Sequence, residues 1–161
     1  MSLGMTQRIA SRIAPAHALV TAVLLLASCT VRLIADYDEH TFNQTAELQQ
    51  QCETLFVALE EAAVTPDLSD DLYAAHSGAY TSLVAALRTL ETRAQTLDKN
   101  EIPAEQVGLL RDSIEMMQAT HRQKSAGNPP QGLSLETVRT LREPVVQQFR
   151  AILTLQEELK R

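Results

Sequence analysis

Aromatic and sulfur-containing side chains are scarce in this sequence. Its 161 residues include no Trp, three Tyr, three Phe and two Cys. So few rings leave little material for an aromatic cage around a ligand, and two Cys are too few for a disulfide framework. The sequence has neither the Cys-x-x-Cys-His motif of covalent haem nor the Glu-x-x-His pair of di-iron bundles. A c-type haem protein is therefore excluded, and a di-iron centre has no support.

Basic residues are few relative to acidic ones. The chain has 14 Lys and Arg against 20 Asp and Glu. Residues 1–28 hold two of the basic residues and none of the acidic ones, so residues 29–161 carry a net charge of −8. No basic cluster interrupts this acidic part. An acidic surface repels phosphates, which argues against a nucleic-acid partner and against charge-driven docking on anionic lipid.

A long apolar run that could span a bilayer is missing as well. The apolar stretch 14–27 is well short of the roughly 20 residues that a permanent membrane-spanning helix needs. Arg8 and Arg12 precede it, and the first acidic residue is Asp36. A positive start followed by a brief apolar region and small residues is the signature of an export signal.

The apolar stretch ends in Leu24-Leu25-Leu26-Ala27-Ser28-Cys29-Thr30. This stretch resembles the lipobox of bacterial lipoproteins, which has an aliphatic residue, two small residues and an obligatory Cys. The resemblance implies that signal peptidase recognises Leu26, Ala27 and Ser28 and that a lipid is attached to Cys29. The covalent lipid is the only prosthetic group expected, and it would hold the protein at the bilayer.

The lipoprotein interpretation divides the chain into a signal peptide, residues 1–28, and one domain, residues 29–161. The domain is long enough for a single hydrophobic core. In lipoproteins, Asp directly after the lipidated Cys commonly signals inner-membrane retention, and here the residue is Thr30. This implies the outer membrane, facing the periplasm. Two alternatives stay open: an uncleaved membrane anchor, and an ordinary secretory signal that happens to contain Cys.

Helical periodicity dominates the chain after Cys29. Apolar residues recur at alternating spacings of three and four, which predicts four helices over about 31–63, 69–98, 103–124 and 134–160. Short connections between helices of similar length favour antiparallel neighbours. The sequence therefore predicts an all-α, antiparallel up-down-up-down four-helix bundle, preceded by a signal-peptide helix.

Several residues mark where the predicted helices begin or bend. Ser69 and Ser134 are suitable N-caps, and Pro103 suits the first position of a helix. Pro144 lies inside the last predicted helix and removes one backbone hydrogen bond, so we expect a kink near Leu141.

The distance between Cys29 and the bundle is short. Ile34 already fits the helical pattern, and no Gly/Ser-rich tether precedes it. We therefore expect the bundle to stand close to the membrane. Antiparallel geometry would collect residues 97–103 and 159–161 at the membrane-proximal end, and the loops around Pro66 and 127–132 at the distal end.

Two histidines suggest a metal site. His76 and His121 occupy core-side positions and come roughly one turn apart when their helices pair antiparallel. Zinc or copper needs three or four ligands, for which Glu60 or Glu61 and Glu136 are candidates at the same end. The alternative is that both imidazoles are partly buried and hydrogen-bond to neighbouring polar groups.

The remaining reactive residues predict no catalysis. Cys52 lies at a core-facing spacing and is expected to be a small buried hydrophobe, while His40 is expected to be solvated. Residues 74–79 are read as a small-residue patch around Gly78 where another helix can approach closely. Met116 and Met117 resemble a soft binding surface, although Met117 fits the core spacing. We therefore expect that the protein is not an enzyme.

The part after the lipobox resembles small helical lipoproteins of Gram-negative bacteria. The likeness rests on segments 34–39, 99–103, 110–114 and 149–153, and the group carries no assigned activity. The leading hypothesis is a membrane-anchored, non-catalytic module that binds or scaffolds an unidentified protein partner. An inhibitor or immunity-type lipoprotein against an envelope enzyme or toxin is the alternative. A bundle that binds a metal or small ligand is the third hypothesis.

Overall fold

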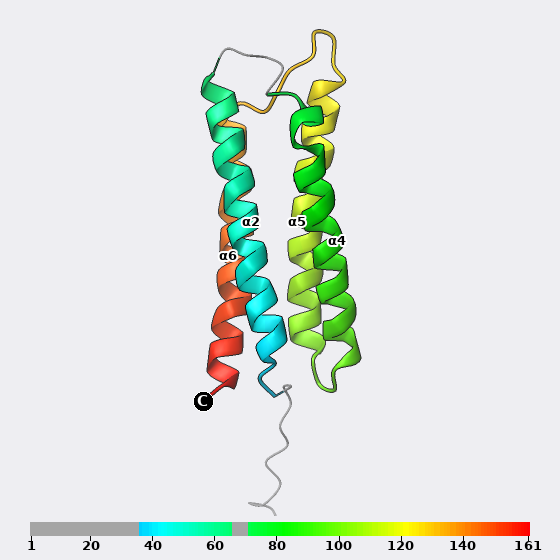
Figure 1. Ribbon diagram of the computed structural model, residues 1–161, viewed down its shortest axis with the longest axis vertical. Coiled ribbons are helices and arrows are strands. Elements are labelled where there is room, and N and C mark those ends of the chain that lie inside the picture. The colour runs from blue at the N-terminus through cyan, green and yellow to red at the C-terminus, as the bar shows by residue number, and fades with distance from the viewer. Residues whose placement is uncertain (1–35, 66–70) are drawn as a thin grey trace, which may run out of the picture. The chain divides into compact units, whose positions relative to one another are not determined.

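The computed structural model describes residues 36–65 and 71–161, and the predicted signal peptide and lipobox lie outside this part. The described residues contain four helices and no strand. They are α2 (Glu39–Val64), α4 (Tyr73–Thr96), α5 (Glu101–Ser125) and α6 (Leu135–Leu159) (Figure 1). The prediction of an all-α four-helix bundle is confirmed.

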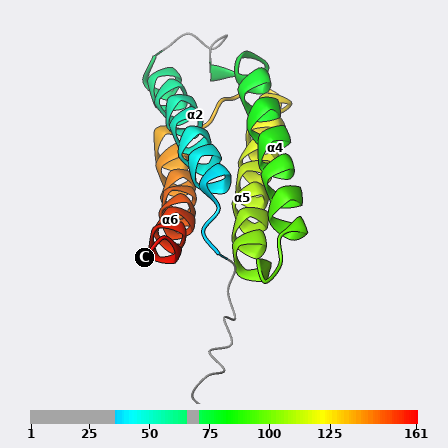
Figure 2. The same ribbon diagram turned by 60° about the horizontal axis from the view of Figure 1, so that its bottom comes forward.

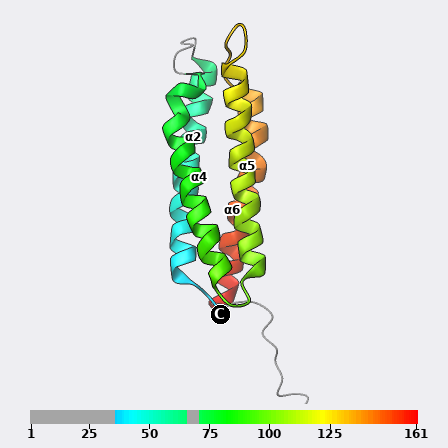
Figure 3. The same ribbon diagram turned by 90° about the vertical axis from the view of Figure 1, so that its right-hand side faces the viewer.

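The helices form a closed ring of antiparallel neighbours. α2 packs beside α4 and α6, and α5 also packs beside α4 and α6, as Figures 1 and 3 show from two sides. The beginning of α2, the α4–α5 turn and the end of α6 share one end of the bundle (Figure 2). We call this end, where the first described helix begins, the proximal end, and the opposite end the distal end. Residues 97–103 and 159–161 therefore gather as predicted, whereas Pro66 lies outside the described residues.

The buried core follows the predicted spacing. Every helix contributes one row of buried side chains, and the central residues have at most 4% exposure. The predicted members of this core are Leu48, Cys52, Leu55, Leu59, Tyr80, Leu83, Leu87, Leu90, Val107, Leu110, Ile114, Met117, Val138, Val145, Phe149 and Ile152. Phe56 and Val84 are also buried, because a packed helix covers an arc wider than its central row.

The observed helix starts differ from the predicted ones. α2 begins at Glu39, where Asp38 accepts a hydrogen bond from the backbone N–H of His40. α4 begins at Tyr73 instead of residue 69, and its first N–H donates to Ser125 Oγ on α5 over 2.8 Å. Ser69 lies outside the described residues. A cap supplied by another helix leaves no local signal, which explains the displaced boundary.

The last two helices begin close to the predicted positions. α5 starts at Glu101, which leaves Pro103 in the first turn, where no backbone donor is needed. Ser134 caps α6 by accepting from the Thr137 N–H over 3.2 Å, as expected. α6 continues as one helix past Pro144.

The α4–α5 turn is held by its own residues. Lys99 has a φ of 58°, in the left-handed region that short turns use. The buried side chain of Asn100 donates to the Ala94 carbonyl over 2.8 Å and thereby closes the end of α4. This turn brings α4 and α5 into the most extensive pairing of the bundle.

The prediction of a close helix contact at Gly78 is wrong. A Cβ built on Gly78 would have no neighbour within 4 Å, because this part of α4 faces solvent. The close approach between α4 and α5 lies at Gly108, where a Cβ would stand 3.1 Å from a Glu91 carboxylate oxygen. Small residues are common on exposed helix faces, so composition alone did not distinguish the two glycines.

Candidate functional site

The two histidines of the predicted metal site come together at the distal end. The ring centroids of His76 and His121 are 5.7 Å apart. His121 is fully buried, whereas His76 is partly exposed. The spacing of the two residues on neighbouring antiparallel helices was therefore predicted correctly.

Both ring nitrogens of His121 are in hydrogen bonds. Nε2 lies 2.9 Å from the backbone carbonyl oxygen of Asp71, so it must carry the proton and donate. Nδ1 is then an acceptor, and the Tyr80 hydroxyl lies 3.3 Å from it as the donor. These contacts define one neutral tautomer and connect α4, α5 and the segment that precedes α4.

Burial controls the protonation of this cluster. The pKa of His121 is lowered, chiefly because burial disfavours the imidazolium ion. Burial also raises the pKa of the Tyr80 hydroxyl and that of the Asp71 carboxyl. The rings of Tyr73 and Tyr80 meet the His121 ring edge-on, each at a centroid distance of 5.9 Å. The result is a neutral, aromatic-lined polar contact within the core.

The additional ligands expected for a metal do not join the histidines. A carboxylate oxygen of Glu60 lies 3.7 Å from the guanidinium of Arg142 on α6. Glu61 and Glu136 are exposed. Among the residues that the structure describes, no group of three or more His, Cys, Asp and Glu side chains could hold a metal ion. For His121 the observed geometry is that of the alternative interpretation, an imidazole hydrogen-bonded to neighbouring polar groups.

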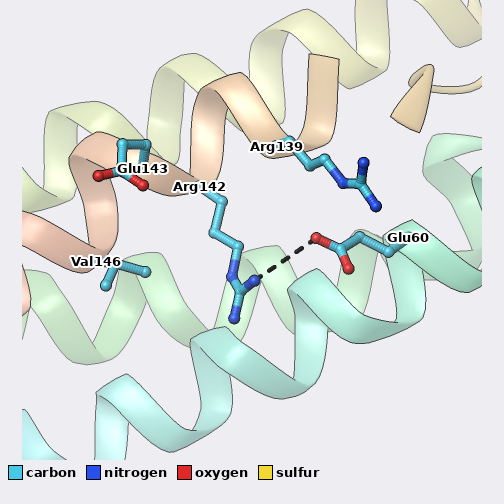
Figure 4. A pocket seen from close by; sticks show the side chains of 5 residues that line it. All are labelled: Glu60, Arg139, Arg142, Glu143 and Val146. Carbon is cyan, nitrogen blue, oxygen red and sulfur yellow. Dashed lines mark ion pairs between the residues drawn. The ribbon is translucent and has the colours of Figure 1, made fainter. Parts of the chain in front are cut away.

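A charged surface pocket of about 430 Å³ lies between α2 and α6 (Figure 4). It is lined by Glu60, Arg139, Arg142, Glu143 and Val146. The Arg142 guanidinium lies 2.5 Å from a Glu53 carboxylate oxygen as well as facing Glu60. Arg142 is thus already neutralised by residues of α2, and the pocket is built as an ion-pair network between two helices.

Exposed apolar side chains gather on α5. The large hydrophobic residues with about half or more of their surface exposed are Val57, Val64, Ile102, Leu109 and Met116. Ile102, Leu109 and Met116 follow one another at intervals of seven residues on α5. We call these three residues the α5 row. Of these three residues only Met116 was expected from the sequence to be a binding residue, although the seven-residue spacing also pointed to Ile102 and Leu109.

The remaining predicted residues divide between the described and undescribed parts. Cys52 is a buried free thiol with 1% exposure, and burial raises its pKa to about 12, as expected for an inert core residue. His40 is exposed, as predicted. Cys29 and the recognition residues Leu26, Ala27 and Ser28 lie outside the described residues.

Comparison of the chain with protein-family models, with curated proteins and with solved structures gave no match. Among the described helices, none combines the length and apolarity needed to cross a membrane.

Proposed function

We propose that the protein is a lipid-anchored module of the bacterial cell envelope that binds another protein without catalysing a reaction. The α5 row carries this proposal, because three half-exposed hydrophobic side chains lie in register on one helix. Aligned apolar residues on a rigid surface are typical of protein-binding sites. The mature chain would face the periplasm, with the outer membrane as its site.

The anchor belongs to the same proposal. The lipobox-like stretch ends at Cys29, and Asp38 caps the first described helix nine residues later. So short a connection would keep the proximal end near the bilayer and the distal end away from it. A stable anchor needs more than one acyl chain, which the lipid of bacterial lipoproteins would provide.

Crosslinking of native membranes followed by mass spectrometry tests the proposal. We expect the lipidated protein to crosslink reproducibly to one protein partner, and the Cys29→Ala variant to lose most of that crosslink because it no longer concentrates at the membrane. Absence of any reproducible partner for both forms would contradict a binding module.

The acidic charge favours a second candidate, inhibition of a basic envelope enzyme or toxin. Residues 29–161 carry a net charge of −8, which would steer a basic target towards the bundle. Deletion of the gene should then increase sensitivity to lysozyme or to a co-occurring toxin. Unchanged sensitivity to such agents would leave only the first candidate.

A further inference from the structure

The α5 row repeats every seven residues, which is the spacing of one of the two apolar positions in a coiled-coil heptad. Two turns of helix separate each residue from the next, so the row extends over about 21 Å at 1.5 Å per residue. Ile102, Leu109 and Met116 are 48%, 52% and 56% exposed. The core residues of the same helix, from Val107 to Met117, are fully buried on a different face. α5 thus presents one apolar row to the bundle and another to solvent.

The two sides of the α5 row differ in charge. With about 100° of rotation per residue, Glu101, Glu105 and Asp112 fall on one side of the row, and all three are exposed. Gln106, Ser113 and Thr120 fall on the other side, which is neutral. One flank of the row is therefore acidic.

Two arginines near the α5 row are already engaged within the bundle. Arg111 pairs with Glu91 on α4 and with Asp112, and Arg88 pairs with Glu115 at 2.7 Å. These cations are turned towards the α4–α5 boundary. They do not cancel the charge of Glu101 and Glu105 on the exposed flank.

We propose that the α5 row docks an amphipathic helix of the partner protein, and that this helix carries Leu or Ile at seven-residue spacing with Lys or Arg beside them. The inference rests on the proposed binding function. It assigns the α5 row as the binding surface and a basic amphipathic helix as the partner's contact. Apolar side chains of the partner would fill the spaces between Ile102, Leu109 and Met116, as knobs fill holes in a coiled coil. Its basic side chains would face Glu101 and Glu105, giving affinity that falls with salt.

A second copy of this chain is a poorer occupant. In a parallel pair, the arrangement that anchors in one membrane would favour, each acidic flank faces the neutral flank of the other copy and meets no cation. In an antiparallel pair around Leu109, the two-fold axis places the acidic flanks of both copies on the same side of the interface. Like charges facing each other across an interface disfavour association. Charge complementarity therefore selects a basic helix of another protein.

Site-specific photo-crosslinking in native membranes tests the inference. A photoreactive residue replaces Leu109 in the lipidated full-length protein, and Val57 on α2, which is 50% exposed, is replaced as the matched control. We expect position 109 to crosslink at least tenfold more than position 57, to a helical segment with basic residues beside its apolar row. Glu105→Lys should reduce that yield at least fivefold, whereas Glu47→Lys on α2 should leave it unchanged.

Other outcomes separate the surface from the function. A partner captured elsewhere on the bundle, with equal yields at positions 109 and 57, would overturn the α5 surface and leave the binding function standing. Crosslinks between two copies of the chain, or to a segment without basic residues, would also overturn it. Absence of crosslinks here and of any partner in the membrane-wide experiment would overturn both proposals.

Discussion

Asp38 holds together three helices at the proximal end. Its carboxylate caps α2 and receives two hydrogen bonds from Arg93 on α4, of 2.9 and 3.0 Å. Its backbone N–H donates to the buried Gln156 side chain on α6 over 3.3 Å. The bond with Arg93 is the main reason that the pKa of Asp38 falls from 3.8 to about 2. One residue thus fixes where α2 begins.

Replacement of Asp38 by Asn removes the charge and keeps a good N-cap. We expect Asp38→Asn to lower the free energy of unfolding at pH 7 by about 1–2 kcal/mol, allowing for the solvent-exposed Arg93. The folded pKa is below the unfolded one, so this stabilisation is complete above about pH 5 and is lost as pH falls through 3.8 towards 2. Urea unfolding at pH 7 and pH 2.5 should show the difference shrinking; equal differences at both pH values would contradict the ion pair.

The buried hydrogen bond between the Tyr80 hydroxyl and His121 Nδ1 should also stabilise the folded protein. Tyr80→Phe leaves the buried Nδ1 of His121 without its donor, which costs about 1–3 kcal/mol. Tyr73→Phe is the matched control, because the Tyr73 hydroxyl accepts from Gln118 and Arg122 near the surface, where water can replace it. Urea unfolding at pH 7.5 should rank Tyr80→Phe as the more damaging change, and the opposite order would contradict the assigned hydrogen bond.

The lowered pKa of His121 also predicts a dependence on pH. The unfolded chain binds a proton at His121 more readily than the folded one, so stability is complete above about pH 7 and declines as pH falls below about 6.5. Urea unfolding at pH 7.5 and 5.5 should show a larger decline in the wild type than in His121→Gln. An equal decline in both proteins would show that His121 is not responsible.

Cys52 is expected to be unreactive while the bundle is folded. Burial and a pKa of about 12 keep the thiol protonated and shielded. In Cys29→Ala protein, where Cys52 is the only thiol, alkylation at pH 8 should be about a hundredfold slower in buffer than in concentrated urea. Rapid alkylation in buffer would contradict the burial of this side chain.

At the scale of helices and loops, two glycines have opposite roles. Gly132 lies in the α5–α6 connection, directly beside the Asp71 carboxylate. A Cβ on Gly132 would stand within 2.0 Å of three Asp71 atoms, whereas a Cβ on Gly78 would meet nothing within 4 Å. The distal connection therefore needs glycine, and the second turn of α4, where Gly78 lies, does not.

This difference predicts changes in stability of opposite sign. Gly132→Ala should lower the free energy of unfolding by about 1–3 kcal/mol, because Asp71 must leave its position. Gly78→Ala should raise it by about 0.5–1 kcal/mol, since Ala has the higher helix propensity. Urea unfolding of both variants checks this, and a stabilising Gly132→Ala would contradict the packing of the distal connection.

The helices were predictable because their signal is local. Apolar spacing alone predicted four helices and nearly all of their buried residues. Ser134 correctly marked the start of α6, because it is a local N-cap. The cap of α4 could not be predicted, since Ser125 is 52 residues from Tyr73. The role of Asp38 was equally hidden, because Arg93 and Gln156 are 55 and 118 residues away.

At the scale of the whole molecule, topology was predicted and surface chemistry was not. Short connections implied antiparallel neighbours, and this brought His76 and His121 together as expected. The nitrogens of His121 are occupied by the Tyr80 hydroxyl and the Asp71 carbonyl. The apolar spacing did not identify these two partners, so it could not decide between a metal ligand and a hydrogen-bonded imidazole. The α5 row was not predicted, because apolar residues spaced by seven also fit buried positions of a helix, and spacing alone does not distinguish a buried row from an exposed one.

We propose that Cys29 anchors the acidic bundle to the membrane, and the proposed function depends first on this anchor. The most direct test is intact mass spectrometry of the protein extracted from bacterial membranes, with Cys29→Ala in parallel. We predict a mature chain that begins at Cys29 and carries a covalent lipid, and no lipid on the Cys29→Ala protein. A chain that retains residues 1–28 without lipid, or a Cys29→Ala variant that still gains lipid, would contradict the claim.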